Sequence, residues 1–246
     1  IFCSSKALAM IVVLEIAMSL VLLIGASLFV RSFLNLQNAA VGFDTAPLMT
    51  LRLYLPGAAY EAAGAKERRV QDIVRRVEGL PGVQAAFASN FIPLGAGGGG
   101  GTVIVEGKTV ARGEEPGITF IGATPRTRQT LNVALASGRD ITEAEETTRT
   151  PVALVNQTMA KQLWPTEDAI GRRFRLTGDE TPEWFTVVGV VADFRHGQGT
   201  NTRPIFPSAY VPYSFAATLN TGLVFRAAGD PAQLTTAVRE QIRLAD

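Results

Sequence analysis

Residues 7–30 read ALAMIVVLEIAMSLVLLIGASLFV, an apolar run that holds one charged side chain, Glu15, and two hydroxyls, Ser19 and Ser27. In a helix that rises about 1.5 Å per residue, this run reaches about 36 Å, enough to cross a bilayer with some tilt. The rest of the chain has no comparable run. The sequence therefore predicts one transmembrane helix, residues 7–30, followed by a domain held against a membrane.

A cleaved signal peptide is the alternative interpretation of this run. The apolar part of a signal peptide is about 7–15 residues long, and this run is longer. Gly25, Ala26 and Ser27 resemble a cleavage site, so this alternative stays open. Cys3 precedes the apolar run, whereas a lipoprotein cysteine would follow it. A retained span is the prediction, and because the chain begins with Ile1, we expect the natural N-terminus to lie further upstream.

Glu15 lies close to the middle of the predicted span, where an ionised carboxylate is costly. One interpretation is that Glu15 is neutral or extends toward the interface. The other is that Glu15 marks a face that contacts partner helices. The charges flanking the run, Lys6 and Arg31, do not give an orientation by themselves.

Composition excludes several classes of protein. The 246 residues carry a net charge of +1 and no dense basic patch with interleaved aromatics, so nucleic-acid binding is not expected. A single cysteine provides neither a disulfide framework nor a thiolate metal site. Mean hydropathy is +0.19, and the apolar run accounts for much of it.

The chain after the span begins with a β-α-β pattern. Residues 31–43 have near-helical spacing and predict a stalk that continues the span. Leu51, Leu53 and Leu55 then alternate with polar positions as in a strand. Residues 60–79 predict a helix, because four apolar residues recur at helical spacing, and residues 83–94 predict a second strand. The apolar face of that helix consists of Val70, Ile73, Val74 and Val77.

The opposite face of this predicted helix is basic. We expect it to be solvated, with a membrane-surface contact as the alternative. Its charged side chains are Lys66, Arg68, Arg69, Arg75 and Arg76.

Gly95, Gly97 and Gly100 match the GxGxxG spacing of dinucleotide-binding loops. A strand pattern, residues 102–106, follows them instead of the helix N-terminus that would hold a pyrophosphate. We therefore predict a mobile loop at Gly95–Gly101.

The remaining chain predicts short helices and strands without a recognisable catalytic motif. Glu143, Glu145 and Glu146 are predicted to form a solvated helix start. A metal site is not expected there, because no further ligands are close in sequence. The only histidine, His196, has no cysteine or spaced carboxylates around it, so a surface or loop position is predicted. For the alternative of an anchored hydrolase, Asp193, Arg195 and His196 are the best candidate polar cluster.

The last pattern is a strand, residues 222–227, followed by a helix. Asp230 and Pro231 are predicted to cap that helix, with an apolar face from Leu234 to Ile242. The chain stops in or just after this helix, so we expect it to be truncated at both ends.

A series of segments resembles the MacB-like, FtsX-related permease subunits of ABC transporters, and the large internally duplicated bacterial permeases most closely. The resemblance begins with the span containing Glu15 and covers nearly the whole chain. The segments, in order, are LFVRSFLNLQNAAVGFDTAPLMTLRLYLP, LNVALASGRDITEAEE, PVALVNQTMAKQLWP, IGRRFRL, FTVVGVVADFRH and DPAQLTTAVREQI.

This resemblance implies an α+β protein in which a transmembrane helix precedes a two-lobed extracytoplasmic domain, the MacB-like periplasmic core domain. Residues 1–6 would be a cytoplasmic flank and residues 44–246 the core domain. A porter-like β-α-β lobe would comprise residues 44–92 and 208–246, and an inserted β-rich lobe residues 93–207. The three later spans and the ATPase of the family are not in this sequence.

The resemblance further implies a non-enzymatic subunit in the bacterial inner membrane that couples a separate cytoplasmic ATPase to export or mechanotransmission. Its partners would be membrane lipid, the ATPase, the other permease helices, a second permease copy or subunit, and a possible periplasmic protein. No catalytic, cofactor-binding or metal-binding residue is expected, and Glu15 is the one candidate contact residue. The alternatives are a one-span binding or adaptor protein and the anchored hydrolase.

Overall fold

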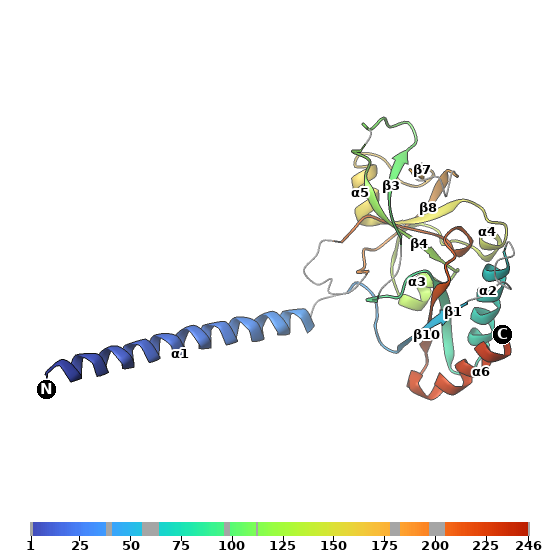
Figure 1. Cartoon of the computed structure of the whole chain (residues 1–246). Helices are drawn as coiled ribbons and strands as arrows, with labels where there is room; N and C mark the ends of the chain where they lie inside the picture. The colour runs from blue at the N-terminus through green and yellow to red at the C-terminus, as the bar shows by residue number, and fades with distance from the viewer. Residues whose placement is uncertain are drawn as a thin grey trace. The chain divides into compact units, whose positions relative to one another are not determined.

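The computed structural model describes residues 2–37, 41–55, 64–95, 99–111, 113–177, 183–196 and 205–245 (Figure 1). It divides into two units, Ile1–Ala40 and Val41–Asp246, and each is described by itself. The helices are α1 (Phe2–Gln37), α2 (Ala65–Glu78), α3 (Thr127–Leu131), α4 (Glu143–Thr147), α5 (Gln157–Leu163) and α6 (Thr235–Ala245), with 3-10 turns η3 (Tyr213–Phe215) and η4 (Pro231–Leu234). The strands are β1 (Leu48–Tyr54), β2 (Val83–Ser89), β3 (Gly99–Val105), β4 (Gly117–Ala123), β5 (Leu135–Gly138), β6 (Val152–Asn156), β7 (Arg173–Leu176), β8 (Phe185–Val191), β9 (Ser208–Pro212) and β10 (Asn220–Ala227).

The first unit contains the long apolar helix α1. Within it, Ala7–Leu34 is long and apolar enough to cross a membrane, with a mean hydropathy of 2.8 and no buried part. The helix continues beyond the predicted span through residue 37, and residues 38–40 of the predicted stalk lie outside the described residues. Residues 41–43 are not helical, however, because Gly42 has a φ of 84°, which a right-handed helix excludes.

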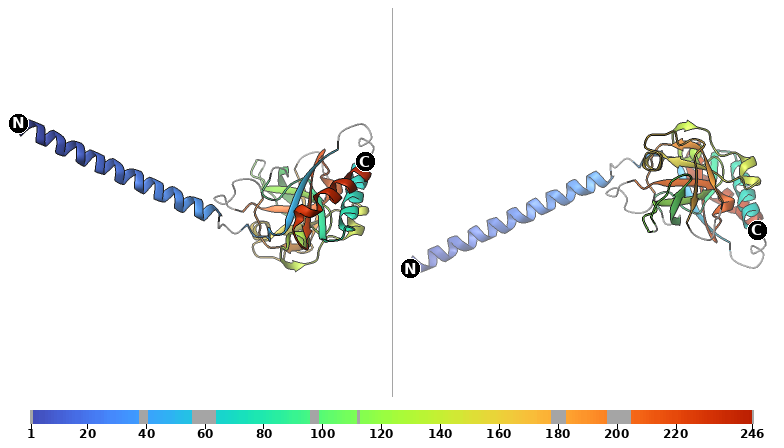
Figure 2. Two further views of the ribbon diagram at one scale, coloured as in Figure 1. Left: turned by 90° about the horizontal axis from the view of Figure 1, so that it is seen from below. Right: turned by 90° about the horizontal axis from the view of Figure 1, so that it is seen from above.

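A three-stranded part of the sheet begins the second unit. Strand β10 lies between β1 and β2 and is antiparallel to both, so β1 and β2 run parallel, as their connection through helix α2 requires. The apolar stripe of α2 and Val238 of α6 pack against the inward side chains of these strands, among them Leu53, Leu223 and Phe225. Figure 2 shows α2 and α6 beside this part of the sheet, which we call the three-stranded sheet.

Six of the other strands form a closed set of pairings. The pairings run from β4 to β3, β7, β8, β6 and β9 and back to β4, which makes a closed ring of six strands. Strand β5 pairs with β8 outside this ring. We call these six strands the six-stranded ring. A single pairing, Ser89 of β2 with Ala123 of β4, joins it to the three-stranded sheet.

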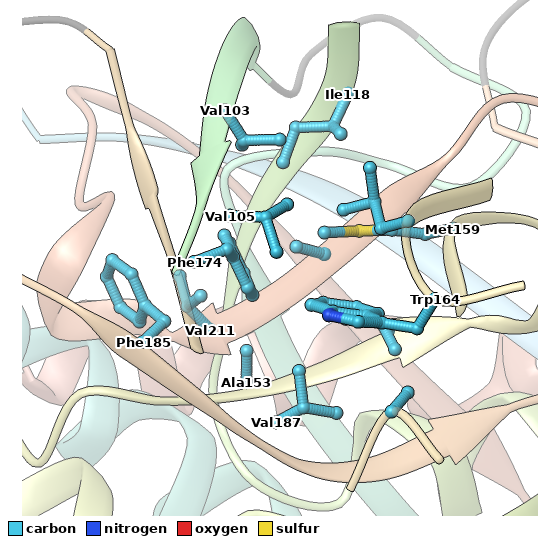
Figure 3. Close-up of a cluster of buried hydrophobic side chains, with 14 of the residues drawn as sticks. Val103, Val105, Ile118, Ala153, Met159, Trp164, Phe174, Phe185, Val187 and Val211 are labelled. Atoms are coloured by element: carbon cyan, nitrogen blue, oxygen red, sulfur yellow. The ribbon is translucent and has the colours of Figure 1, made fainter. Parts of the chain in front are cut away.

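The six-stranded ring has its own apolar core (Figure 3). Phe174 and Phe185 stack at 5.8 Å between ring centroids, while Met159 and Trp164 from the α5 region fill the space beside them. Buried Asn156 caps α5, since its side-chain oxygen accepts hydrogen bonds from the main-chain N–H groups of Met159 and Ser208, both at 2.9 Å. The same residue therefore fixes both α5 and the start of β9.

The predicted mixed fold, with an N-terminal apolar helix followed by a β-rich domain, is confirmed. The boundary between the two predicted lobes stays a prediction. Strand β9, which begins at residue 208, is hydrogen-bonded to β4 and β6 of the six-stranded ring rather than to the three-stranded sheet. The predicted strand at residues 83–94 ends at Ser89, and residues 60–63 of the predicted helix lie outside the described residues.

Candidate functional site

Residues 41–47 are the first residues of the second unit and follow α1 in the sequence, and we call them the attachment segment. Three main-chain hydrogen bonds fix this segment. Arg195 N–H donates to the carbonyl of Val41 at 2.8 Å, Asp44 N–H to that of Leu131 at 3.1 Å, and Ala227 N–H to that of Pro47 at 3.0 Å. The partners come from three distant parts of the sequence, so the segment is held by the fold as a whole.

Arg226 fixes the same segment from the central strand β10. Its side chain is 10% exposed, and its guanidinium donates hydrogen bonds to Asp44 and Ala46 of the segment and to Thr130 of α3. The acceptors are the Thr130 carbonyl at 2.7 Å, the Ala46 carbonyl at 2.7 Å, the Asp44 carbonyl at 2.7 Å and Asp44 Oδ2 at 3.1 Å. The planar fork of arginine suits this role because several donors point in fixed directions. A buried cation is compensated here by one carboxylate and three carbonyls.

Gly42 allows the segment to approach the end of β8. A Cβ atom at this position would lie 2.6 Å from the carbonyl oxygen of Asp193, and φ is 84°. A larger residue would therefore meet both a steric clash and an unfavourable backbone conformation. Beside it, the rings of Phe43 and Phe194 meet edge to face, with centroids 6.0 Å apart and planes at 78°.

An aromatic group that includes the only histidine continues from Phe194. His196 packs against Phe91, Phe194 and Tyr210 at ring-centroid distances of 5.1, 4.4 and 5.6 Å, respectively. A hydrogen bond of 2.7 Å joins His196 Nε2 to the Tyr210 hydroxyl. Burial lowers the pKa of His196 to about 4, partly opposed by the charge of Asp193. His196 thus lies in a loop, as predicted, but is packed into the interior instead of lying on the surface.

The three residues of the hydrolase alternative have hydrogen-bond partners other than one another. Asp193 uses both carboxylate oxygens on Thr158, accepting from its N–H at 2.9 Å and from its hydroxyl at 2.8 Å. His196 bonds to Tyr210 instead, and the Arg195 main chain bonds to the attachment segment. In the described part of the chain, no group of three His, Cys, Asp or Glu side chains is placed to hold a metal ion.

The three acids of α4 differ from one another. Glu143 is exposed, and Glu145 completes a capping box with Thr142 while pairing with Arg139 at 2.7 Å. The prediction of a solvated helix start is wrong for Glu146, which is only 3% exposed. Its hydrogen-bond partners include main-chain groups 67 and 68 residues away, which no local pattern could indicate.

The glycine-rich run also differs from its prediction. Gly99, Gly100 and Gly101 belong to β3 and pair with β4, so they are not a loop, while residues 96–98 lie outside the described residues. A strand and not a helix follows the GxGxxG match, as predicted.

The basic residues of α2 and Glu15 of α1 are the remaining residues singled out from the sequence. On α2, Arg68, Arg75 and Arg76 are exposed, and Lys66 and Arg69 are partly buried. Glu15 is exposed on α1.

The model of one protein family, the MacB-like periplasmic core domain, matches residues 9–244. The chain belongs to this family. It is a family of non-catalytic periplasmic domains of ABC transporter permeases, and it places the chain in a membrane-associated ABC transporter context. With its apolar N-terminal helix, the chain is a membrane protein with an extracellular domain.

Two solved structures have the same fold. The periplasmic region of MacB from Actinobacillus actinomycetemcomitans gives a TM-score of 0.55 at 15% identity, over 82% of this chain and 85% of that one. The extracellular domain of the noncanonic ABC-type transporter YknZ from Gram-positive bacteria gives a TM-score of 0.50 at 15% identity, over 80% of this chain and 92% of that chain. None of the curated proteins matches the sequence.

Proposed function

We propose that this chain is part of an ABC transporter permease subunit in a bacterial inner membrane, and that its globular unit couples the motion of a separate ATPase to export or mechanotransmission. The observation that carries this proposal is the family match together with the attachment segment. ATP-driven motion would enter through α1 and reach the extracytoplasmic unit at residues 41–47. The partners are the cytoplasmic ATPase, the other permease helices, a second permease copy or subunit, membrane lipid and a periplasmic protein.

The attachment segment is suited to transmit motion because several short hydrogen bonds tie it to separate elements of the fold. Arg226 bonds it to β10, the strand at the centre of the three-stranded sheet. Asp44 also bonds to Leu131, the last residue of α3, and Val41 bonds to Arg195 in the segment after β8. A displacement of residue 41 would therefore move several elements together, since close-packed interiors transmit strain.

We propose that Glu15 contacts a partner helix. With about 3.6 residues per turn, Ser19 and Ala26 lie on the same side of α1 as Glu15 and provide small neighbours, as helix interfaces in membranes prefer. Replacing Glu15→Leu in the complete permease should lower the yield of intact permease–ATPase complex several-fold on size-exclusion chromatography. Ile24→Leu, about half a turn away in direction, is the matched control and should leave the yield unchanged. Equal yields for both variants would contradict the contact.

The proposed function has a direct genetic test. Continuing the parent reading frame past Asp246 should reveal three further hydrophobic spans, and the full-length product should co-purify with an ABC ATPase. A stop codon shortly after Asp246 would instead favour a one-span binding or adaptor protein.

A further inference from the structure

The carboxylate of Glu146 lies where three separate elements meet. Its Oε2 accepts a hydrogen bond from the main-chain N–H of Tyr213 at 2.7 Å. Its Oε1 accepts from the N–H of Ser214 at 3.1 Å and from the side-chain amide of Gln71 at 3.2 Å. One buried side chain on α4 thus holds both α2 and η3.

Helix α2 covers the three-stranded sheet, and η3 directly follows β9 of the six-stranded ring, while Tyr213 of η3 packs into the same apolar cluster as α2. Other contacts also link these parts of the fold, among them the pair of Glu78 with Arg126 at 3.2 Å and the hydrogen bond from Ala88 N–H to Thr124 Oγ1 at 2.9 Å. Glu146 is therefore one of several links, and it ties α2, α4 and η3 together with one carboxylate.

Solvent protons can reach this connection. Glu146 lines a cleft between α2, α4 and residues 124–126, with a volume of about 90 Å³, which is room for several water molecules. Gln71, Glu78, Arg126 and Glu143 line the same cleft.

The charges around Glu146 come from every element packed against it. Helix α2 contributes Glu67, Arg75 and Glu78, of which Glu78 is paired with Arg126 at 3.2 Å. On α4, Glu143 faces the cleft and Glu145 is engaged by Arg139. From η3, Tyr213 is the titratable group, and its hydroxyl bonds to Thr221 at 2.6 Å.

Burial raises the pKa of Glu146, because the ionised form is poorly solvated; the donors from Gln71, Tyr213 and Ser214 oppose this effect, and the negative charge of Glu67 adds to it. When the joint between α2, α4 and η3 opens, water solvates the carboxylate and its pKa returns toward the ordinary glutamate value. The closed form therefore binds a proton more readily than the open form, and acidification favours the closed form.

We propose that Glu146 is a proton-controlled joint between α2, α4 and η3, which opens more readily as pH rises. This goes beyond the proposed function and does not depend on an ATPase. It makes the mobility of the extracytoplasmic unit responsive to the pH of its own compartment.

Amide hydrogen exchange of the full chain in nanodiscs tests this joint between pH 4.5 and 7. After correction for intrinsic exchange rates, protection of the Tyr213 and Ser214 amides should fall several-fold as pH rises. Glu114→Gln, at an exposed acid outside this cleft, should behave like the wild type, and Glu146→Gln should lose the pH response. Gln71→Ala removes a donor that favours the ionised form, so the response should move to higher pH.

Two results would overturn the proposal. One is an equal pH response in the wild type and in Glu146→Gln, which would show that Glu146 does not bind the proton. The other is an equal change at Tyr213 and at Ile104 in β3, which would show that pH alters the stability of the whole unit and not this joint.

Discussion

Arg226 and Asp44 lie 182 residues apart in the sequence, and the Arg226 guanidinium donates hydrogen bonds to both the side chain and the main chain of Asp44. The pair joins the first residues of the globular unit to the last strand of its sheet. Strand β1, which begins four residues after Asp44, pairs with β10 over its whole length, from Leu48 with Arg226 to Tyr54 with Asn220. The first residues of the globular unit are thus held to β10 by both side-chain and strand hydrogen bonds.

Replacing Arg226→Ala should destabilise the globular unit by about 3 kcal/mol, because it removes a buried, multiply hydrogen-bonded guanidinium and leaves the carbonyl of buried Thr130 without this donor. Arg226→Lys should restore only part of the loss, since one ammonium cannot reach all four acceptors. Urea unfolding followed by tryptophan fluorescence measures both. Arg52→Ala, an exposed arginine on β1, is the control and should cost less than about 0.5 kcal/mol. Equal effects of Arg226→Ala and Arg52→Ala would show that the attachment is not structurally important.

His196 should titrate well below a free histidine. Its pKa of about 4 lies under the ordinary value of 6.5, so the folded state favours the neutral ring. The resulting stability is present above pH 6.5 and is lost as pH falls toward 4. Because this is the only histidine, one imidazole resonance in an NMR titration of untagged protein reports it directly. A midpoint near 6.5 would mean that the aromatic group does not exclude water, and His196→Gln should remove this part of the pH dependence.

Glu145 should act in the opposite direction to Glu146. The hydrogen bonds from Arg139 lower the pKa of Glu145 to about 2, with a smaller contribution from Thr142, and burial opposes them. Its contribution to stability is present above pH 4.5 and is lost as pH falls toward 2. In acid unfolding followed by circular dichroism, Glu145→Gln should flatten this loss, and Glu143→Gln should not. Identical curves for both variants would contradict the pairing with Arg139.

The two faces of α2 should respond differently to truncation. Arg75 is 73% exposed in its side chain and pairs with Asp72 only at 3.9 Å, so Arg75→Ala should change stability by less than about 0.5 kcal/mol. Val77 is fully buried, and Val77→Ala should cost about 2 kcal/mol. Comparable losses in thermal unfolding would show that both faces of the helix are packed.

Local patterns predicted much of the fold. The apolar run of α1 and the helical stripe of α2 depend on residues near one another in the sequence, and the structure has both. The prediction of a loop at Gly95–Gly101 is wrong for its last three residues, because Gly99–Gly101 form a strand through their pairing with β4. A period-two pattern cannot be seen in residues that have no side chains.

Most contacts of the candidate site could not be predicted from the sequence, because they join residues that are far apart in the chain. Arg226 lies in a strand pattern, and its acceptors in residues 44–46 and at Thr130 are brought to it by the fold. Glu146 follows two exposed acids, and only the arrival of η3 from beyond β9 buries it. The one local signal was Gly42, a single glycine just after the long helix, where the chain turns and approaches Asp193 closely.

The central claim is that ATP-driven motion reaches the globular unit through residues 41–47. The most direct test uses the complete permease with its ATPase in nanodiscs, in a Cys3→Ala background. A spin label at Arg75→Cys is paired with one on the extracytoplasmic domain of the second permease copy, and their distance is measured with and without ATP. We predict that the distance changes with nucleotide and that Arg226→Ala reduces the change while ATP binding persists. The same distance in every nucleotide state would contradict the account.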